Sequence, residues 1–197
     1  MPKNTPKRSP KTKAQRIGDR GENRIANALK TEWESQYILS NIILQNGDST
    51  SQIDHIAVTQ QGVFVIEVKN FHANKVTCPL KDKYWYYMAY DGKTLKKYTF
   101  YNPLWQNATH TNLIKNILSD SVPIYSVVTF ALNNPLEFIG GTKPKNVLSI
   151  YELIPYIKAF PECLPEDLRN NIVETIKRHH LSNVTIEEHI QSISKFI

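Results

Sequence analysis

Three ionisable residues, Asp54, Glu67 and Lys69, interrupt the otherwise apolar stretch IDHIAVTQQGVFVIEVKN, residues 53–70. Burying an ion costs several kcal/mol unless the ion is paired or bound to a metal. A chain that places two carboxylates and an ammonium among buried strand residues needs a compensating interaction for them. These three residues are therefore the first candidates for chemistry.

The apolar residues around them predict two central strands, residues 52–59 and 62–70, joined by the tight QQG hairpin. Side chains alternate between the faces of a strand, so Glu67 and Lys69 share one face. A turn centred on the two glutamines puts Asp54 opposite a position close to Glu67. The sequence thus predicts a compact polar cluster, with one carboxylate on each of two neighbouring strands and a lysine two residues further along.

Two carboxylates this close repel each other unless a cation lies between them. Hard oxygen ligands favour Mg²⁺ or Mn²⁺ over Zn²⁺. Such a cation can activate water, and a neighbouring lysine can orient that water or stabilise developing phosphoryl charge. Spacing alone leaves a second interpretation open, in which the lysine forms a purely structural buried ion pair with Asp54 or Glu67.

Two predicted helices can bring further polar groups to this cluster. In the first, residues 14–33, Glu22 lies on the same face as Ile25 and Leu29. Gly18, on the same face, and Gly21 weaken the start of this helix; they either let another segment approach closely or only allow the N-terminal turn to fray.

The second helix, residues 103–119, begins after Asn102 as N-cap with proline at its first position. Its apolar face continues back to His110 and Gln106, which are four residues apart. Both polar side chains are therefore predicted to face the sheet.

The order of the remaining elements indicates the fold class. Further strands are predicted at residues 37–45, 123–131 and 146–150, and Asp91-Gly92 predicts a hairpin of one or two extra antiparallel strands near an edge of the main sheet. Helices follow at residues 151–159, 166–180 and 186–196, the last with a capping box from Thr185 to Glu188. The pattern predicts a mixed α/β central sheet flanked by helices, with a β-hairpin insertion and a helical C-terminal part, residues 151–197.

The net charge of +6 comes from the start of the chain. Residues 1–16 contain no acid, and without their six cations the rest of the chain is neutral; these are Lys3, Lys7, Arg8, Lys11, Lys13 and Arg16. Residues 1–13 are predicted to be a disordered basic arm that either contacts phosphates or aids solubility, and residues 14–197 a single domain.

Several classes of protein are disfavoured by composition. No apolar run approaches the roughly 18 residues of a membrane span, and the basic start lacks the apolar core of a secretory signal, so we expect a cytoplasmic protein that does not bind membranes. Cys78 and Cys163 have no CxxC partner, so a zinc site or a disulfide framework is not expected.

A family resemblance supports the catalytic interpretation. Asp54, followed by Glu67-Val68-Lys69 on the next strand, resembles the PD-(D/E)XK nuclease signature. The segments GDRGE, QIDHIAV and GVFVIEVKN, Trp85 in the insertion, and NPLWQNATH resemble, in this order, the motifs of the nuclease-related domain (NERD) family. The resemblance covers residues 18–118 and implies a restriction-endonuclease-like fold.

The resemblance also implies roles for individual residues. Asp54, Glu67 and the main-chain carbonyl of Val68 would ligate Mg²⁺ or Mn²⁺, and Lys69 would position the attacking water or stabilise charge at the phosphate. The remaining implied positions lie on the two helices: Glu22 would complete the metal shell, Gln106 would line the site, and His110 would lie one turn beyond Gln106.

Other residues have weaker claims to function. His55 points away from Asp54 and is expected to pack or to make a supporting hydrogen bond, and His72 lies close enough after Lys69 to touch substrate. His179 and His180 end a helix, where the helix dipole favours them. The aromatic residues of the insertion either stack on unpaired bases or pack in their strands; they are Tyr84, Trp85, Tyr86, Tyr87 and Tyr90.

The function expected from these observations is metal-dependent cleavage of nucleic-acid phosphodiesters, with DNA as the expected substrate. The alternatives are a nuclease-like module that binds nucleic acid or a partner without cleaving, and an interaction domain with a buried ion pair. Retention of all four of Glu22, Asp54, Glu67 and Lys69 favours the enzyme. A partner protein or a homodimer would supply specificity.

Overall fold

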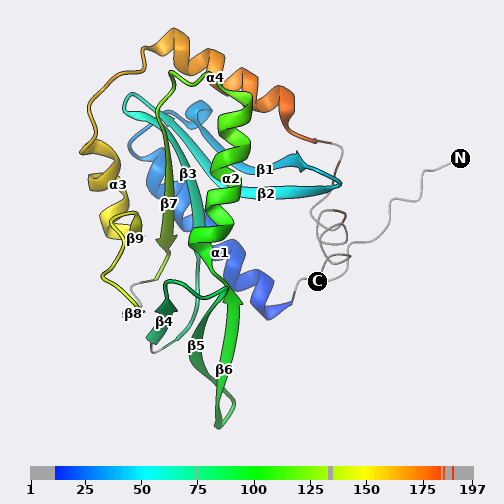
Figure 1. The fold of residues 1–197 in the computed structure, drawn as a ribbon, viewed down its shortest axis with the longest axis vertical. Helices are drawn as coiled ribbons and strands as arrows, with labels where there is room; N and C mark the ends of the chain where they lie inside the picture. Colours follow the sequence, from blue (N-terminus) through cyan, green and yellow to red (C-terminus); the bar gives the residue numbers. More distant parts are fainter. Residues whose placement is uncertain (1–11, 74, 133–134, 183, 185–187, 189–197) are drawn as a thin grey trace, which may run out of the picture.

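The computed structural model of the 197-residue chain describes residues 12–73, 75–132, 135–182, 184 and 188 (Figure 1). Lys3, Lys7, Arg8 and Lys11 of the predicted basic arm lie outside the described residues, and so does the predicted helix 186–196 apart from Glu188. The basic arm and this helix therefore stay predictions.

The main sheet has five strands in the order β1-β2-β3-β7-β9. The pairs β1/β2 and β2/β3 are antiparallel, whereas β3/β7 and β7/β9 are parallel. The predicted mixed sheet is thus confirmed. Its strands are β1 (Ile38–Asn46), β2 (Ser49–Thr59), β3 (Gly62–Lys69), β7 (Ile124–Phe130) and β9 (Val147–Ser149).

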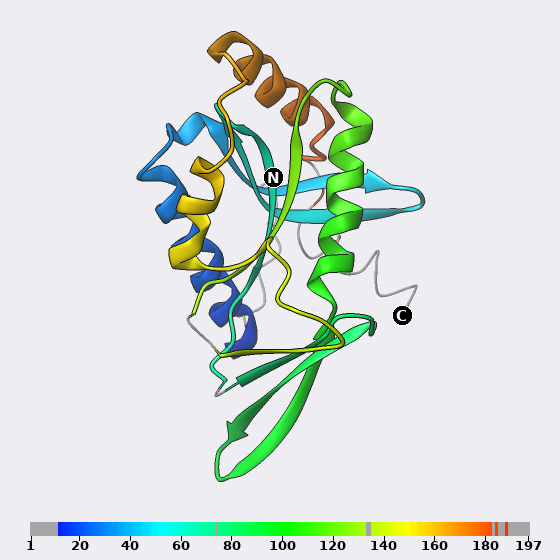
Figure 2. The ribbon, with the colours of Figure 1, turned by 60° about the vertical axis from the view of Figure 1, so that its left-hand side comes forward.

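Helices cover both faces of this sheet (Figure 2). On one face α2 (Pro103–Ile117) and α4 (Glu166–His179) pack on β2 and β3 through residues such as Ile114 and Ile176. On the other face α1 (Lys13–Lys30) and α3 (Ile150–Lys158) contribute Ile25 and Leu153 to a second core. The two apolar faces explain why β3 is buried along almost its whole length.

The predicted elements of this layer agree with the structure to within three residues at each end. The first helix, for example, ends at Lys30 instead of residue 33, and a short 3₁₀ turn, Ser35–Tyr37, follows before β1. One strand, β8 (Leu136–Ile139), was not predicted. It has only four residues, and the Asn-Asn-Pro and Gly-Gly segments on either side of it are typical of loops, so the sequence pattern favoured a loop here.

The insertion lies near the β7-β9 edge of the main sheet, as expected, but it forms a sheet of its own, in the order β6-β5-β4-β8, instead of extending the main sheet. Its strands are β4 (Lys75–Pro79), β5 (Tyr84–Asp91), β6 (Thr94–Tyr101) and β8, with Gly92 in the predicted hairpin turn. The physical reason is a third apolar core, in which Trp85 and Val76 pack against Val128 and Phe130 of β7. Trp85 and Tyr87 therefore belong to strand packing.

Asparagines of the NPLWQN segment join the second sheet and α2 to the main sheet. Asn102 caps α2 by accepting from the Leu104 N–H (3.0 Å) and donates to the Asp82 carbonyl (2.9 Å). Asn107 is fully buried, and its Nδ2 donates to the carbonyls of Val65 in β3 (2.8 Å) and Val127 in β7 (2.9 Å). One side chain thereby fixes α2 against two central strands.

Replacing Asn107 by alanine is expected to lower the free energy of unfolding by about 2–4 kcal/mol, because two buried carbonyls lose their donor. Denaturant unfolding of the purified chain measures this. Asn112→Ala, at an exposed position of the same helix, is the matched control and should cost less than about 0.5 kcal/mol. Equal losses in the two variants would contradict the role given to Asn107.

Candidate active site

Strands β2 and β3 separate at Asp54. Their pairing runs from Thr59–Gly62 to His55–Ile66, as a turn at Gln60-Gln61 requires, and stops one step before Asp54 and Glu67. On the other side of β2, the pairing with β1 is also interrupted at Asp54. The β1 residue opposite Asp54 is Asn41, which has a positive φ of 56°. A non-glycine residue with positive φ marks a local distortion of the strand.

The Asp54 side chain replaces the missing backbone partner. Its Oδ2 accepts the N–H of Val68 at 2.8 Å. This bond ties the two strands together beyond the end of their ladder and holds the Asp54 carboxylate beside the Glu67-Val68-Lys69 segment. The predicted neighbourhood of Asp54 and Glu67 therefore follows from both register and a direct side-chain bond.

Glu67 and Lys69 form the centre of the cluster. Lys69 Nζ lies 2.6 Å from Glu67 Oε1 and donates to Gln106 Oε1 at 3.2 Å. The Glu67 side chain is 2% exposed, and that of Lys69 is 17% exposed. Lys69 is thus the member of this pair that reaches solvent.

Residues from both faces of the sheet meet where β2 and β3 separate. From α2, His110 is buried with its Nδ1 3.5 Å from Glu67 Oε2, one turn beyond Gln106. From α1, on the opposite face, the negative charge of Glu22 acts on both Asp54 and Lys69. The structure therefore brings together all five residues for which a catalytic role was predicted, and His110 with them.

The cluster carries an excess of negative charge. Burial raises the pKa of Asp54 well above its usual value, and the charges of Glu67 and Glu22 raise it further, against the opposing effects of Lys69 and the Val68 N–H. Burial alone would lower the pKa of Lys69, but the attraction of Glu67, Asp54 and Glu22 outweighs it and raises this pKa. Lys69 is consequently an ammonium ion at neutral pH.

The donor set suits a hard divalent cation. Three carboxylates face a single ammonium, and burial together with the charges of Glu67 and Glu22 raises the pKa of Asp54 in spite of that ammonium. The residues that could hold such an ion are Asp54, Glu67, Glu22 and the Val68 carbonyl, all oxygen donors. As the side chains stand, no three His, Cys, Asp or Glu residues in the described ranges are arranged as a ready metal cluster. Lys69 occupies the position beside Glu67 Oε1.

Three residues position the α1 side of the site: His55, whose supporting hydrogen bond was predicted, and Ser40 and Asn70, which were not. His55 Nε2 donates to the Glu22 carbonyl (3.0 Å), while its Nδ1 accepts from Ser40 Oγ (2.9 Å), which defines the neutral tautomer. Asn70 Nδ2 donates to the Ile17 carbonyl in α1 (2.6 Å). The sequence signal for His55 and Asn70 was their position immediately after Asp54 and Lys69.

Only one of the two helix glycines is needed for a close approach. A Cβ added at Gly21 would lie 2.5 Å from Cβ of Asn70, so a side chain there would push α1 away from β3. A Cβ at Gly18 would meet nothing within 4 Å, and the expected close approach is wrong at this position. Gly21, one residue before Glu22, thus lets α1 reach the site.

Within the described part of the chain, no contact brings the weaker substrate-binding candidates His72 and Arg16 to the cluster. His72 is exposed between β3 and β4 and makes no hydrogen bond or ion pair within the described part of the chain. Arg16 is exposed on α1, and Lys13 is the first residue of that helix. Their roles stay predictions.

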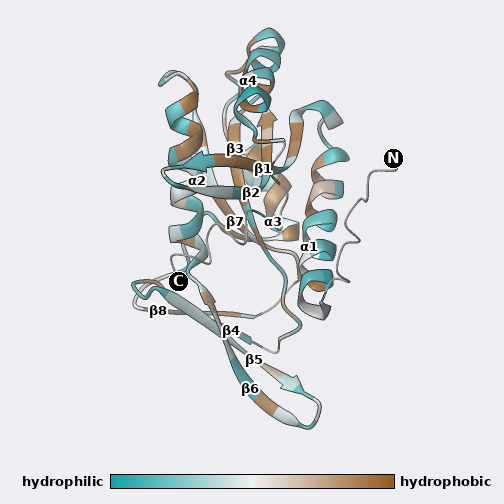
Figure 3. Ribbon diagram, turned by 90° about the vertical axis from the view of Figure 1, so that its right-hand side faces the viewer, coloured by the Kyte–Doolittle hydropathy of each residue, from teal (hydrophilic) through white to brown (hydrophobic). Residues whose placement is uncertain are grey.

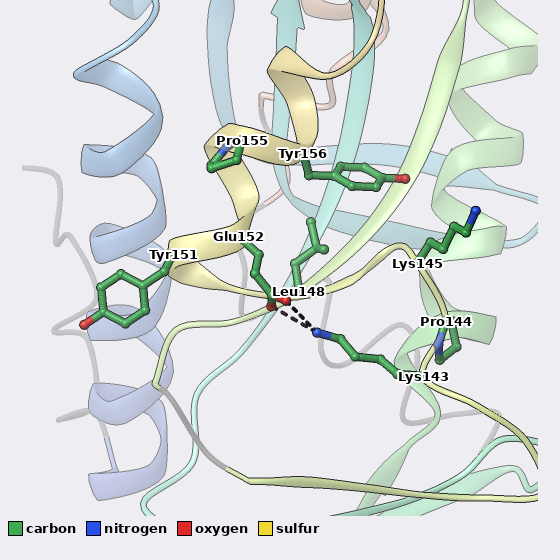
Figure 4. A pocket seen from close by; sticks show the side chains of 8 residues that line it. All are labelled: Lys143, Pro144, Lys145, Leu148, Tyr151, Glu152, Pro155 and Tyr156. Atoms are coloured by element: carbon green, nitrogen blue, oxygen red, sulfur yellow. Dashed lines mark hydrogen bonds and ion pairs between the residues drawn. The ribbon is translucent and has the colours of Figure 1, made fainter.

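A hollow of about 630 Å³ lies apart from these carboxylates, between α3 and the segment before β9 (Figure 4). Lys143 at its rim donates to both carboxylate oxygens of Glu152, at 2.9 and 3.0 Å. None of the predicted catalytic residues lines it. Lys143 and Glu152 thus neutralise each other in this hollow.

The fold and the Asp54, Glu67-Val68-Lys69 arrangement together define a restriction-endonuclease-like α/β protein with a PD-(D/E)XK signature. Residues 17–131 match the family description "Nuclease-related domain", and the chain belongs to this family. An uncharacterized protein of Bacillus anthracis is 30% identical over 182 residues, which are 87% of this chain and 80% of that protein. No solved structure matches the chain significantly.

None of the helices in the described part of the chain combines the length and the apolar character that a bilayer crossing needs.

The buried His55 predicts a pH dependence of stability. Burial, opposed by the bond to Glu22, lowers its pKa from 6.5 to about 4. Below pH 6.5 His55 therefore becomes protonated in the unfolded chain, whereas in the folded chain it stays neutral down to about pH 4. The free energy of unfolding in EDTA should fall by about 3 kcal/mol across this window and be unaffected by His55 above it.

Denaturant unfolding between pH 7.5 and 4 measures this loss. His55→Gln should lack this component, whereas His179→Gln, at an exposed helix end, should keep the wild-type profile. The same pH profile in wild type and His55→Gln would show that His55 titrates normally in the folded chain.

Proposed function

We propose that the protein is a Mg²⁺- or Mn²⁺-dependent nuclease that hydrolyses nucleic-acid phosphodiesters, with DNA as its substrate. One observation carries the proposal: the Lys69 ammonium, held between Glu67 and Gln106, lies beside a buried Asp54 whose pKa is strongly raised. A cluster built only for stability would gain little from such an excess of buried negative charge. Membership in the nuclease-related domain family supports the same class of reaction.

Lys69 has the properties of a group that stabilises a phosphoryl transition state. Hydrolysis forms a bond between a water oxygen and phosphorus and breaks a phosphorus–oxygen bond, while negative charge gathers on the phosphoryl oxygens. The attraction of Glu67, Asp54 and Glu22 outweighs burial and raises the pKa of Lys69, which favours its ammonium form. Lys69 donates hydrogen bonds to the phosphate or to the oxygen of the attacking water, and Gln106 holds it in place.

Asp54 and Glu67, with Glu22 and the Val68 carbonyl, would hold the cation. When bound, the cation would neutralise these carboxylates, polarise the phosphate and promote ionisation of water. Its positive charge would also weaken the attraction between Glu67 and Lys69. The Lys69 side chain, which is partly exposed, would then be freer to donate to the substrate.

Asp54→Ala and Lys69→Ala are each expected to reduce metal-dependent cleavage by at least about 100-fold, because each removes a group that stabilises the reaction centre. The assay is digestion of a plasmid and of single-stranded oligonucleotides with Mg²⁺, Mn²⁺ or EDTA. Asp120→Ala, in an exposed turn, is the matched control and should cleave like wild type.

Cleavage at wild-type rate by Asp54→Ala or Lys69→Ala would disprove the mechanism. Retention of DNA by the wild-type chain in EDTA, with no cleavage in either metal, would instead indicate a nuclease-like binding module.

Divalent cations are expected to stabilise the folded chain. A cation at about 100 times its dissociation constant raises the free energy of unfolding by about 2.7 kcal/mol if it binds only the folded state. Thermal unfolding with and without Mn²⁺ measures this shift, which should vanish in Asp54→Ala and persist in Asp120→Ala. An interaction domain with a structural ion pair would show no stabilisation in the wild type.

Specificity would come from outside this cluster. We propose that a second copy of the chain or a partner protein supplies it. Sedimentation of the chain with and without DNA would show whether the nuclease acts as a homodimer.

A further inference from the structure

The β5–β6 hairpin projects from the body of the molecule (Figures 1 and 3). The pairing of β5 with β6 divides its side chains between two faces. The inner face packs into the third core through Trp85, Tyr87 and Phe100. The outer face carries Tyr84, Tyr86, Tyr90, Lys97 and Tyr101; we call these residues the aromatic platform.

The aromatic platform is exposed and has cations over its rings. Tyr90 is 65% exposed, and Tyr84 and Tyr101 are exposed as well. Lys97 Nζ lies 3.8 Å from the ring centroid of Tyr86, and Lys83 Nζ lies 5.4 Å from that of Tyr84. Exposed aromatic faces with interleaved cations are the elements with which proteins hold unpaired bases and their phosphates.

The charge of this segment favours a polyanion. Residues 81–101 contain five lysines and two aspartates, and Lys96 pairs with Asp91 (2.5 Å) on the inner face of the hairpin. The lysines over the aromatic platform have no acidic partner among the described residues. A polyanion with flat apolar groups therefore matches the platform better than an apolar protein surface does.

The aromatic platform leads to the carboxylate cluster. Tyr84 and Tyr101 are in edge contact with centroids 6.3 Å apart, and Tyr101 contacts Trp105 in the first turn of α2 in the same way, at 6.4 Å. Trp105 is 42% exposed, and the next residue, Gln106, accepts from Lys69 Nζ. The bonds of Asn102 to the turn just before β5 and to α2 fix this connection.

We propose that the aromatic platform, continued by Trp105, binds single-stranded nucleic acid and guides it to the site. This inference rests on the proposed function and names its substrate as a strand with unpaired bases. The reason is geometric, because a flat ring can stack on a base only where the base face is open, and in a duplex these faces are covered by neighbouring base pairs.

Binding of a fluorescent single-stranded oligonucleotide to the full chain in EDTA, followed by anisotropy, tests this inference. Tyr90→Ala and Trp105→Ala should each weaken binding by at least about fivefold, the cost of one lost stacking interaction. Lys97→Ala should reduce the slope of log affinity against log salt by about 0.7, the value for one phosphate contact on a single strand. A duplex of the same sequence should bind more weakly.

Matched variants separate the ring from general effects. Tyr90→Phe keeps the ring and should keep the affinity. Tyr151→Ala removes an equally exposed tyrosine, 68% exposed on α3, and should bind like wild type. Circular dichroism of each variant, together with its thermal unfolding, checks that the fold is retained.

Unchanged affinity in both Tyr90→Ala and Trp105→Ala would overturn the inference even if the chain cleaves DNA. Equal affinity for the duplex would overturn it as well. A wild-type dimer that dissociates in these variants, with unchanged oligonucleotide affinity, would assign the platform to a second copy of the chain and overturn it too.

The reverse failure is distinguishable, because Asp54→Ala should bind the oligonucleotide at least as tightly as wild type. Binding through the platform without any cleavage would therefore refute the nuclease and leave this inference standing.

Discussion

Beyond the pair His55–Ile66, strands β2 and β3 no longer share backbone hydrogen bonds, and the groups released there need other partners. Asp54 satisfies the Val68 N–H with its side chain, which places a carboxylate inside the sheet beside Glu67. Because the strands separate at this point, α1 and α2 can both contribute to the same cluster from opposite faces of the sheet. The local end of one ladder thus makes the site possible.

The surrounding contacts fix this arrangement at a cost in stability. Burial disfavours a carboxylate and neighbouring carboxylates repel one another, and the raised pKa of Asp54 reflects its burial first and that repulsion second. Asn107 fixes α2 to β3 and β7, and His55 fixes α1 at Glu22. These bonds hold side chains that would otherwise move apart. Such a balance is typical of functional sites, where electrostatic strain is kept by well-packed neighbours.

The sequence was most informative where a pattern has one physical interpretation. Alternation placed Glu67 and Lys69 on one face, and the short hairpin fixed the register that sets Asp54 beside them. Helical spacing placed Gln106 and His110 on the inner side of α2. Strand alternation and helical spacing depend only on local backbone geometry, and the tertiary packing of this protein agrees with both.

The remainder depended on contacts between distant segments. The second sheet forms because β4 pairs with β8, about 60 residues later, around a core that includes Trp85; local propensity carries no information on such pairing. For the same reason Gly18 and Gly21 looked alike in sequence, although only Gly21 lies against Asn70. The outer and inner aromatic residues of the hairpin likewise became distinguishable only from their neighbours.

The central claim is that the carboxylates around Lys69 form a site for a divalent cation. A crystal structure of the chain grown with Mn²⁺, with data collected at the manganese absorption edge, tests it most directly. We predict one strong anomalous peak in contact with Asp54 and Glu67, with Lys69 moved away from Glu67 Oε1. A map without anomalous density at these carboxylates, with the Lys69–Glu67 pair intact at saturating Mn²⁺, would contradict it.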